Sequence, residues 1–467
     1  MSNTHILTCD KKYNAQKSMS TDEETFVGVI DEGVNSTRFL VFSSKTHLPI
    51  ACHQISIPNI NVYEGWLVLD PEDILMKIKT TIAVVCKKLN MMHILSSAIA
   101  AIGVTNQRGT TLVWDKYTGA PLYHALIWMD MATTQSIVDR FINKQISNCN
   151  TLDEQKKFLQ SKCGSTLNPH FSVFKLIWLM ENVPQVSKAI QEERCMFGTM
   201  DSWLIWVNFF LIILKLLKPN NLVMQIFNYK YLLMRNRFFD IPESLIFPEI
   251  RSCSEVYGLM AHGPLIATPI SGCIGDHQGA FLGQLCFIAG VAKCTFGTNC
   301  FLLYNTGRKP VISSHGLLTT IAYKIGKHSD PIYALEGSVA VSDFTTEWLK
   351  DNLWVMDIYK NVNESTNNLA NIEGDLNKIH LIPALSELYA PFWKTDANGK
   401  LTGQIIDTST AYLMRETLER ICSQTNEVLQ SMHTDTGHPI VALNVDGGMS
   451  TNDTFLKILT NICRLPV

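Results

Sequence analysis

Two segments, each made of β-rich apolar runs on both sides of a short turn, constrain the fold of this chain more than any other feature. The first, FVGVIDEGVNSTRFLVFSSKT, begins at Phe26 and turns within residues 31–36. The second, AKCTFGTNCFLLYN, spans residues 292–305 and turns at 297–299. Apolar runs joined by glycine-containing polar turns are typical of β-hairpins. The sequence therefore predicts two hairpins of similar architecture, one opening each half of the chain.

Strands and helices alternate along the rest of the sequence. Helical spacing covers residues 71–89, and the buried-strand run IAAIGVT at 99–105 is followed by the loop NQRGTT and a second strand, LVWD. The late segment at 440–459 predicts a strand that ends in the sequence DGG and then a helix capped by Ser450 or Thr451. This alternation indicates an α/β protein.

The length of the chain favours two domains. At 467 residues, it exceeds the ~250 to 300 residues at which one hydrophobic core usually stops growing. We expect an N-terminal domain over residues 26–285 and a C-terminal domain over residues 286–467. Residues 1–25 mix charged and polar side chains without an apolar stretch, so we interpret them as a disordered tail and not as a signal peptide.

Composition excludes several classes of partner. A formal net charge of −3, with 17% charged residues, leaves no basic excess for sequence-independent binding of nucleic acid or anionic membranes. The 13 cysteines are scattered and include no C-x-x-C pair, so neither a disulfide framework nor a zinc knuckle is predicted. These thiols fit a reducing cytosol, and we expect a cytoplasmic protein.

One apolar stretch, WLIWVNFFLIILKLL at residues 203–217, has the composition of a membrane segment. Asn208 and Lys215 interrupt it, and it is shorter than the ~18 to 20 apolar residues that a spanning helix requires. We interpret it as a buried helix or strand and not as a membrane element.

The glycine-containing turns are candidate phosphate sites. Glycine lets backbone N–H groups approach phosphate oxygens, and clustered amides with hydroxyl groups form an anion nest. The DGG sequence at 446–448 would let a flat adenine or ribose lie against the backbone. Each of the three glycine-containing turns, taken alone, is typical of an ordinary turn. The three together, in this order along the chain, favour nucleotide binding. The P-loop and Rossmann glycine patterns are absent from the sequence.

The chain resembles the glycerol kinases over residues 26–206 and 241–467. Segments that carry the resemblance include GVNSTRFLVF, IGVTNQRGTTLVWDKYTGAPLYHALIW, PISGCIGDHQGAFLGQLC, KCTFGTNCFLLYNTG, YALEGSV and VDGGMSTND. NQR with GDHQ separates this family from actin and chaperone relatives. The resemblance implies an α/β fold of two actin-like (ribonuclease H-like) lobes, two carbohydrate-kinase domains around a nucleotide cleft. It also implies ATP and Mg²⁺, and phosphoryl transfer to glycerol or a similar small polyol.

The resemblance implies a substrate site made of Arg108, Trp128, His170, Asp276, His277 and Phe301. Asp276 matches the general base that accepts the proton of the attacking hydroxyl, although it could instead cap a helix starting near His277. Arg108 matches the arginine that donates hydrogen bonds to vicinal hydroxyls. Trp128 and Phe301 match aromatic walls against the carbon skeleton, although core aromatics have the same character.

On the nucleotide side, the resemblance assigns the two phosphate turns and the adenosine-proximal turn to Asp31, Gly33, Gly297, Thr298, Gly448 and Asn452. Asp31 would hold Mg²⁺ through water, because this ion gives up its hydration shell reluctantly. Read by itself, Asp31 could equally be an Asx-turn residue.

Several residues depart from the family pattern. Gly109 stands where the family has a glutamate that accepts hydrogen bonds from glycerol, a loss of about 1 to 3 kcal/mol. The substitution Gly109→Glu is therefore predicted to raise kcat/KM for glycerol. His170 replaces a tyrosine and His277 a glutamine, and both imidazoles can still form hydrogen bonds. Departures on the nucleotide side are Val34, Asn35, Asn299, Asp343 and Glu347.

Two longer segments also differ from the family. Residues 208–239 match nothing in it, and the chain ends at RLPV where relatives continue with further helices. The resemblance therefore implies an incomplete second lobe.

Three functions remain open at this point: a glycerol kinase, a catalytically impaired paralogue that acts as a binding or regulatory protein, and a kinase of another polyol or sugar. The sequence leaves the oligomeric state open, a homo-oligomer included.

Overall fold

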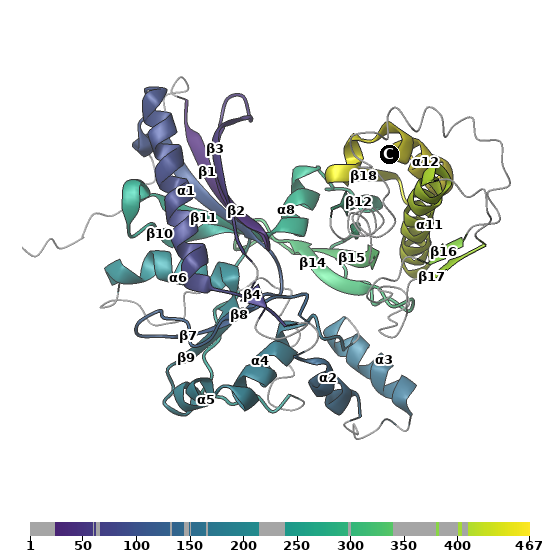
Figure 1. Ribbon diagram of the computed structural model, residues 1–467, viewed down its shortest axis with the longest axis horizontal. Coiled ribbons are helices and arrows are strands. Elements are labelled where there is room, and N and C mark those ends of the chain that lie inside the picture. Colours follow the sequence, from purple (N-terminus) through teal and green to yellow (C-terminus); the bar gives the residue numbers. More distant parts are fainter. Residues whose placement is uncertain are drawn as a thin grey trace, which may run out of the picture.

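The computed structural model describes residues 24–58, 60–61, 66–130, 133–143, 149, 151–164, 167–213, 239–297, 300–339, 380–382, 400–403 and 410–467. In Figure 1 the chain forms two lobes, an N-terminal one in purple to teal and a C-terminal one in green to yellow. The N-terminal lobe contains β1–β11, α1–α6 and α8, and the C-terminal lobe contains β12–β18 with α11 and α12. The expected residues 1–25 tail falls almost wholly outside the described residues.

A six-stranded sheet in the order β10-β11-β6-β1-β2-β3 forms the centre of the N-terminal lobe. Its strands are β1 (Phe26–Glu32), β2 (Ser36–Ser43), β3 (Pro49–Ser56), β6 (Ile99–Asn106), β10 (Ser254–Leu259) and β11 (Pro269–Gly275). β6 runs parallel to both β1 and β11, so the carboxyl ends of these three strands meet at one edge. That edge faces the C-terminal lobe and positions the site described below.

Helix α1 (Pro71–Met91) covers this sheet because its apolar residues recur at helical spacing (Figure 1). Its buried stripe includes Ile74, Ile78 and Ile82. The helix begins after Asp70, whose side chain accepts hydrogen bonds from two backbone N–H groups of the first turn.

A second sheet in the N-terminal lobe has the order β4-β5-β8-β7-β9. Its strands are β4 (Ile60–Asn61), β5 (Leu67–Leu69), β7 (Thr111–Asp115), β8 (Ala125–Leu126) and β9 (Cys195–Thr199). The helices around it are α2 (Gln135–Ile142), α3 (Leu152–Cys163), α4 (Ser172–Asn182), α5 (Pro184–Gln191) and α6 (Met200–Ile213). α6 confirms a helix over residues 203–213 of the apolar stretch, where Trp203, Leu204 and Ile205 are buried, and residues 214–217 lie outside the described part of the chain. Within the described residues no helix is long and apolar enough to cross a membrane.

The C-terminal lobe contains a five-stranded sheet in the order β14-β15-β13-β12-β18. Its strands are β12 (Val291–Phe296), β13 (Cys300–Gly307), β14 (Leu318–Tyr323), β15 (Ile332–Val339) and β18 (Ala442–Asp446). Helices α11 (Thr410–Thr436) and α12 (Asp453–Cys463) lie side by side on it, and β16 (His380–Ile382) pairs with β17 (Lys400–Thr402) (Figure 1). α8 (Asp276–Gly283) contacts strands of both lobes.

Both predicted hairpins are confirmed, as β1–β2 and β12–β13, and the two-lobed α/β fold is confirmed with them. The late strand and helix are confirmed as β18 and α12. The predicted cap of that helix is wrong. Ser450 and Thr451 lie in a 3₁₀ turn, and the side chain of Asn452 accepts the two N–H bonds that cap α12. Because of this extra turn, α12 begins at Asp453, two residues later than a cap at Ser450 predicts.

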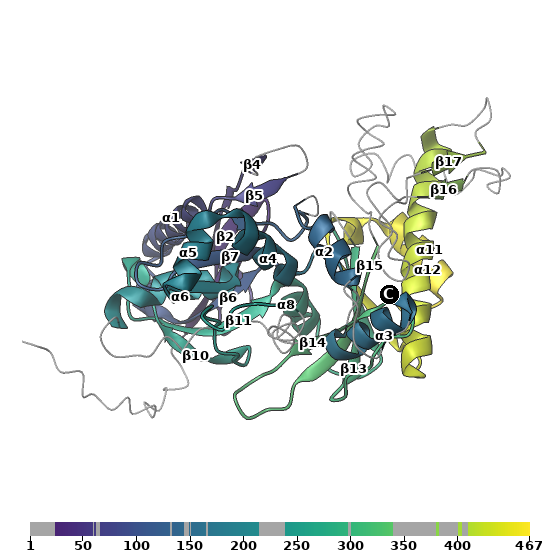
Figure 2. The same ribbon diagram turned by 90° about the horizontal axis from the view of Figure 1, so that it is seen from below.

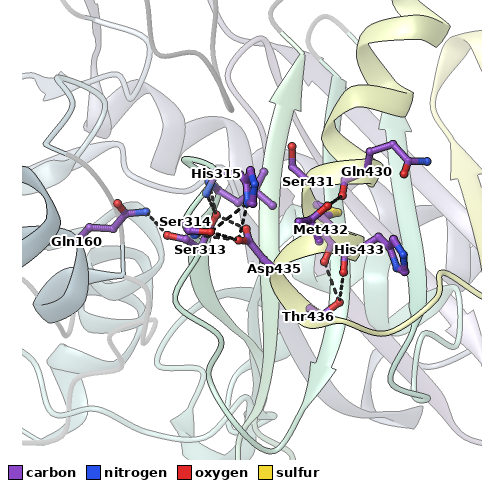
Figure 3. A network of polar contacts seen from close by, with 12 residues as sticks. Gln160, Ser313, Ser314, His315, Gln430, Ser431, Met432, His433, Asp435 and Thr436 are labelled. Carbon is purple, nitrogen blue, oxygen red and sulfur yellow. Dashed lines mark hydrogen bonds and ion pairs between the residues drawn. The ribbon is translucent and has the colours of Figure 1, made fainter.

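Contacts between the segment of α3 and the C-terminal lobe join the two halves of the chain, and Figure 2 shows α3 beside β13 and β14. Gln160 Nε2 donates to the carbonyl of Ser313 at 2.8 Å, and the N–H of Thr319 donates to the carbonyl of Gly164 at 2.6 Å. Ser313 also belongs to a polar network around Asp435, near the end of α11 (Figure 3).

Asp435 stabilises that network as a buried acceptor, with 1% of its side chain exposed. It accepts bonds from the Ser313 hydroxyl, from the Ser314 N–H and hydroxyl at 2.9 and 2.8 Å, and from His315 Nδ1 at 2.7 Å. Burial acts to raise the pKa of Asp435, but the hydrogen bonds from Ser313, His315 and Ser314 outweigh it, so that the pKa is lowered.

We expect Asp435→Asn to lower the free energy of unfolding at pH 7 by about 1 to 3 kcal/mol, measured by urea denaturation. Because the carboxylate pKa is lowered in the folded state, its contribution is present above its unfolded pKa of about 3.9 and is lost as the pH falls through the lower folded value. Asp330→Asn is the control, since its ion pair with Arg308 is largely exposed. Equal losses in the two variants would contradict a special role for the network.

Candidate active site

A cavity of about 360 Å³ lies between the lobes, at the edge where β1, β6 and β11 end. Its volume is at the lower end of the range for small-molecule sites. The predicted residues that line it are Gly33, Arg108, Gly109, Trp128, His170, Asp276, His277, Gly297 and Phe301. The structure therefore brings the six predicted substrate residues into one space, together with one glycine from each phosphate turn.

Arg108 follows β6 and reaches across to the C-terminal lobe. Its Nη1 and Nη2 donate to the two carboxylate oxygens of Glu336, in β15, at 2.8 and 2.6 Å. Side-chain exposure is 10% for the arginine and 5% for the glutamate, so this is a buried bidentate ion pair. Although burial acts to lower the pKa of Arg108, Glu336 raises it, and the guanidinium stays charged.

Asp276 is the first residue of α8, directly after β11. Gly275 occupies the cap position, and Asp276 Oδ1 accepts a 2.7 Å bond from the N–H of the next residue, His277. Its side chain is 40% exposed, in the cavity. Desolvation raises the pKa of Asp276 to about 6, with Arg108 opposing the rise. The group is therefore mostly ionised at neutral pH and basic enough to accept a proton.

Aromatic rings form one wall of the cavity. The ring centroids of Trp128 and Phe301 are 5.8 Å apart, those of Trp128 and His170 5.6 Å, and those of His277 and Phe301 4.4 Å. Burial, then repulsion from Arg108, lowers the pKa of His277 well below its usual range, so the imidazole is neutral. The wall therefore presents apolar faces with a neutral hydrogen-bonding group beside the carboxylate of Asp276.

A buried lysine holds two loops of this wall in place. Lys175 Nζ, on α4, donates to the carbonyl of Pro169 at 2.8 Å and to that of Trp128 at 3.3 Å. His170 Nδ1 also lies 3.1 Å from the Trp128 carbonyl. Burial lowers the pKa of Lys175 to about 7, with the buried Asp130 opposing it. The lysine connects the segments that carry Trp128 and His170.

The nucleotide-side residues are divided between the cavity and its surroundings. Gly33 and Gly297 line the cavity, whereas Gly448 starts the 3₁₀ turn after β18 and Asn452 caps α12. Thr298 lies outside the described residues, as do Asn299, Asp343 and Glu347 among the departures from the family pattern. The roles of all these residues in binding nucleotide stay predictions.

The acidic residues near the cavity are the candidates for a Mg²⁺ site. Asp31 lies within β1, not in the turn, and pairs with Arg38 at 2.6 Å. Burial raises the pKa of its neighbour Glu32 to about 8, and Asp276 and Asp31 add to the rise. Groups of three metal-ligating side chains are absent from the described residues. Mg²⁺ commonly uses one or two carboxylates with water and phosphate oxygens, so the carboxylate of Asp31 has the chemistry to hold the ion through water together with a nucleotide.

The backbone at Gly109 has a conformation that the sequence does not reveal. Its φ of +79° lies in the left-handed region, and a Cβ there would be 3.2 Å from the Cβ of Trp128. A residue with a side chain is strained in this conformation. The left-handed backbone therefore favours glycine at position 109, independently of any contact between this residue and the substrate.

Sequence reasoning missed Glu336, Lys175 and Glu32. Each is a charged residue in or directly after a mostly apolar run: YALEGSV, SVFKLIWLM and FVGVIDE. Charged side chains are seldom fully buried unless they are paired, so a charge at an inward position of a buried element is the signal that could have identified them.

Known proteins with similar sequences bear directly on this site. Residues 26–283 match the N-terminal domain of the FGGY family of carbohydrate kinases, and residues 292–467 match its C-terminal domain. The chain is 37% identical to a probable glycerol kinase of Dictyostelium discoideum, over 95% of this chain and 87% of that protein. It is also 37% identical to a glycerol kinase of Arabidopsis thaliana, over 95% of this chain and 85% of that protein.

Solved structures show the same fold. The crystal structure of Plasmodium falciparum glycerol kinase with ADP matches with a TM-score of 0.81 and 30% identity, covering 94% of this chain and 85% of that one. Gluconate kinase from Lactobacillus acidophilus matches with a TM-score of 0.77 at 17% identity, a likeness of fold alone.

Proposed function

Because this chain belongs to the FGGY family of carbohydrate kinases, we propose that it transfers the γ-phosphoryl group of ATP to glycerol, giving glycerol 3-phosphate and ADP. The observation that carries this proposal is that Asp276 and Arg108 line one cavity with an aromatic wall and two glycine-containing turns. The sequence similarity to glycerol kinases over 95% of the chain supports the same substrate.

In the proposed reaction Asp276 accepts the proton of the attacking hydroxyl. Phosphoryl transfer requires little covalent work from the protein, so one positioned carboxylate and charge stabilisation suffice. A pKa of about 6 keeps this carboxylate ionised at pH 7 while preserving its basicity. Arg108 donates hydrogen bonds to substrate hydroxyls, and Trp128 with Phe301 packs on the carbon atoms.

The nucleotide would lie between Gly33 and Gly297, whose turns come from different lobes. Backbone N–H groups at such turns bind phosphate oxygens without a side chain in the way. Mg²⁺, held by Asp31 through water, would neutralise charge on the transferred phosphoryl group. Closure of the lobes around both substrates would exclude water and so suppress hydrolysis of ATP.

The test is a coupled ADP-release assay on the purified full chain with Mg²⁺, ATP and, in turn, glycerol, several other polyols and ketoses. Turnover with glycerol at the highest kcat/KM supports the proposal. A higher kcat/KM for another polyol would identify a different kinase of the same family. Polyol and ATP binding by calorimetry without turnover would identify the catalytically impaired form.

Gly109→Glu tests whether the substrate site lacks a carboxylate. Sequence alone predicts a gain in kcat/KM, but the left-handed backbone at Gly109 predicts a loss of about 1 to 2 kcal/mol of stability and no gain in glycerol kcat/KM. Gly109→Ala is the matched control for backbone strain. If the glutamate variant exceeded the alanine variant tenfold in kcat/KM, a missing carboxylate would be the better explanation.

The proposed location is the cytoplasm. Eleven cysteines of the described residues are free thiols, and most of them are buried. Unpaired thiols in this number fit a reducing compartment.

A further inference from the structure

We propose that Glu336 is a positioning residue for the polyol: it orients Arg108 from the opposite lobe, so that side chains of both lobes complete the substrate site. This inference rests on the proposed function, because it concerns the same cavity. Neither the family resemblance nor the sequence pattern assigns a role to this glutamate.

The first observation is the position of Glu336 in the fold. It lies in β15, in the interior of the C-terminal sheet, opposite Leu303 of β13 and Leu318 of β14. Only 4% of the residue is exposed. A carboxylate in such surroundings is costly unless it is paired, so the sheet by itself does not account for its presence.

The second observation is its partner. Both carboxylate oxygens accept bonds from Arg108, which follows β6 in the other lobe. The fork-to-fork geometry fixes the plane of the guanidinium as well as its position. Since Arg108 and Glu336 both line the cavity, this plane determines where the guanidinium presents its N–H groups to a substrate.

The third observation concerns charge balance. Asp276 is a second carboxylate near Arg108, since both residues line the cavity and each affects the pKa of the other. Without Glu336, Arg108 would be drawn to Asp276, the proposed base. Glu336 therefore keeps the guanidinium available for the polyol and away from a direct pair with the base.

Gly109 supplies no carboxylate to this arrangement. The residue after Arg108 carries no side chain and has a backbone conformation that disfavours one. The carboxylate beside Arg108 is instead supplied by the opposite lobe. Because the ion pair joins residues of the two lobes, the orientation of Arg108 depends on how the lobes are placed relative to each other.

The test compares wild type with Glu336→Gln, which keeps the shape of the side chain and removes its charge. We expect the KM for glycerol to rise on the order of 10- to 100-fold, with the KM for ATP changed less than about twofold. Glu416→Gln is the matched control. Glu416 is a buried glutamate of the same lobe, paired with Arg420 at 2.6 Å, and neither residue lines the cavity. It should change the melting temperature without changing the KM for glycerol.

A double-mutant cycle separates action through Arg108 from direct contact with substrate. An Arg108→Lys background lacks the planar guanidinium that pairs with both carboxylate oxygens. In that background, Glu336→Gln should raise the KM for glycerol much less than in wild type. An unchanged effect in that background would overturn the positioning role. So would a glycerol KM for Glu336→Gln within twofold of wild type.

Failure of the proposed function gives a different result. If wild type binds glycerol without turnover, the kinase assignment fails. The positioning role of Glu336 is then tested by calorimetry, through the ratio of the glycerol Kd of Glu336→Gln to that of wild type. Should that ratio stay within twofold, or should wild type bind no polyol of the panel, the inference fails as well. A loss of folding in Glu336→Gln is checked by melting temperature, and Glu336→Asp, which keeps the charge, should then restore part of the glycerol affinity.

Discussion

Replacing Asp276 with asparagine is expected to lower kcat about 10²- to 10⁴-fold, the usual contribution of a positioned general base. The amide cannot accept the proton of the attacking hydroxyl, although it fills the same space at the start of α8. ATP affinity should change little, because the base acts on the substrate hydroxyl in the transition state. Steady-state kinetics and calorimetric ATP binding measure the two effects separately.

The raised pKa of Asp276 adds a pH signature to this prediction. With a pKa of about 6, the carboxylate is lost as a base when the pH falls through 6, so kcat/KM for glycerol should decline on the acidic side of that value. The residual activity of Asp276→Asn should lack this decline. Asp330→Asn, a change at an exposed ion pair, is the control. Unchanged turnover in Asp276→Asn would remove Asp276 from the mechanism.

Replacing Gly447 with alanine is expected to destabilise the C-terminal lobe by about 3 kcal/mol or more, from backbone strain and overpacking together. Gly447 has a φ of +93°, and a Cβ there would lie 2.1 Å from the carbonyl oxygen of Phe296. Because the obstacle is the backbone of β12, no side-chain rotation can relieve it. Phe296 directly precedes the turn that contains Gly297, so ATP affinity should fall as well.

Gly326→Ala is the matched control for Gly447→Ala. Gly326 has a φ of +91° and no atom within 4 Å of its ideal Cβ position, so it reports the conformational strain without the clash. We expect a loss of about 1 to 2 kcal/mol there, measured by urea denaturation. If the two variants lost the same stability, the close approach to β12 would not matter.

Local patterns predicted the elements of this fold well. The hairpins at β1–β2 and β12–β13, helix α1 and strand β6 are encoded by apolar periodicity and glycine turns within a few residues. The predicted cap at Ser450 or Thr451 is wrong because a 3₁₀ turn lies between β18 and α12, and Asn452 caps the helix instead.

The candidate site was predictable only in part. The resemblance identified Arg108, Trp128, Asp276 and Phe301, and the structure places them around one cavity. It did not identify Glu336, which is 228 residues from Arg108 in the sequence. A contact between residues so far apart depends on how two sheets meet, and no local pattern records it.

The sequence by itself determined the two α/β lobes, the family and the chemical groups available for phosphoryl transfer, because those depend on local periodicity and on motifs of a few residues. Tertiary structure alone decided that Gly109 has a left-handed backbone and that Glu336 supplies the carboxylate beside Arg108. It also decided the protonation of Asp276, since desolvation and the charge of Arg108 exist only once β6, β11 and β15 have come together. Charge balance in the cleft is a property of the assembled lobes, because electrostatic energies depend on distances that folding sets.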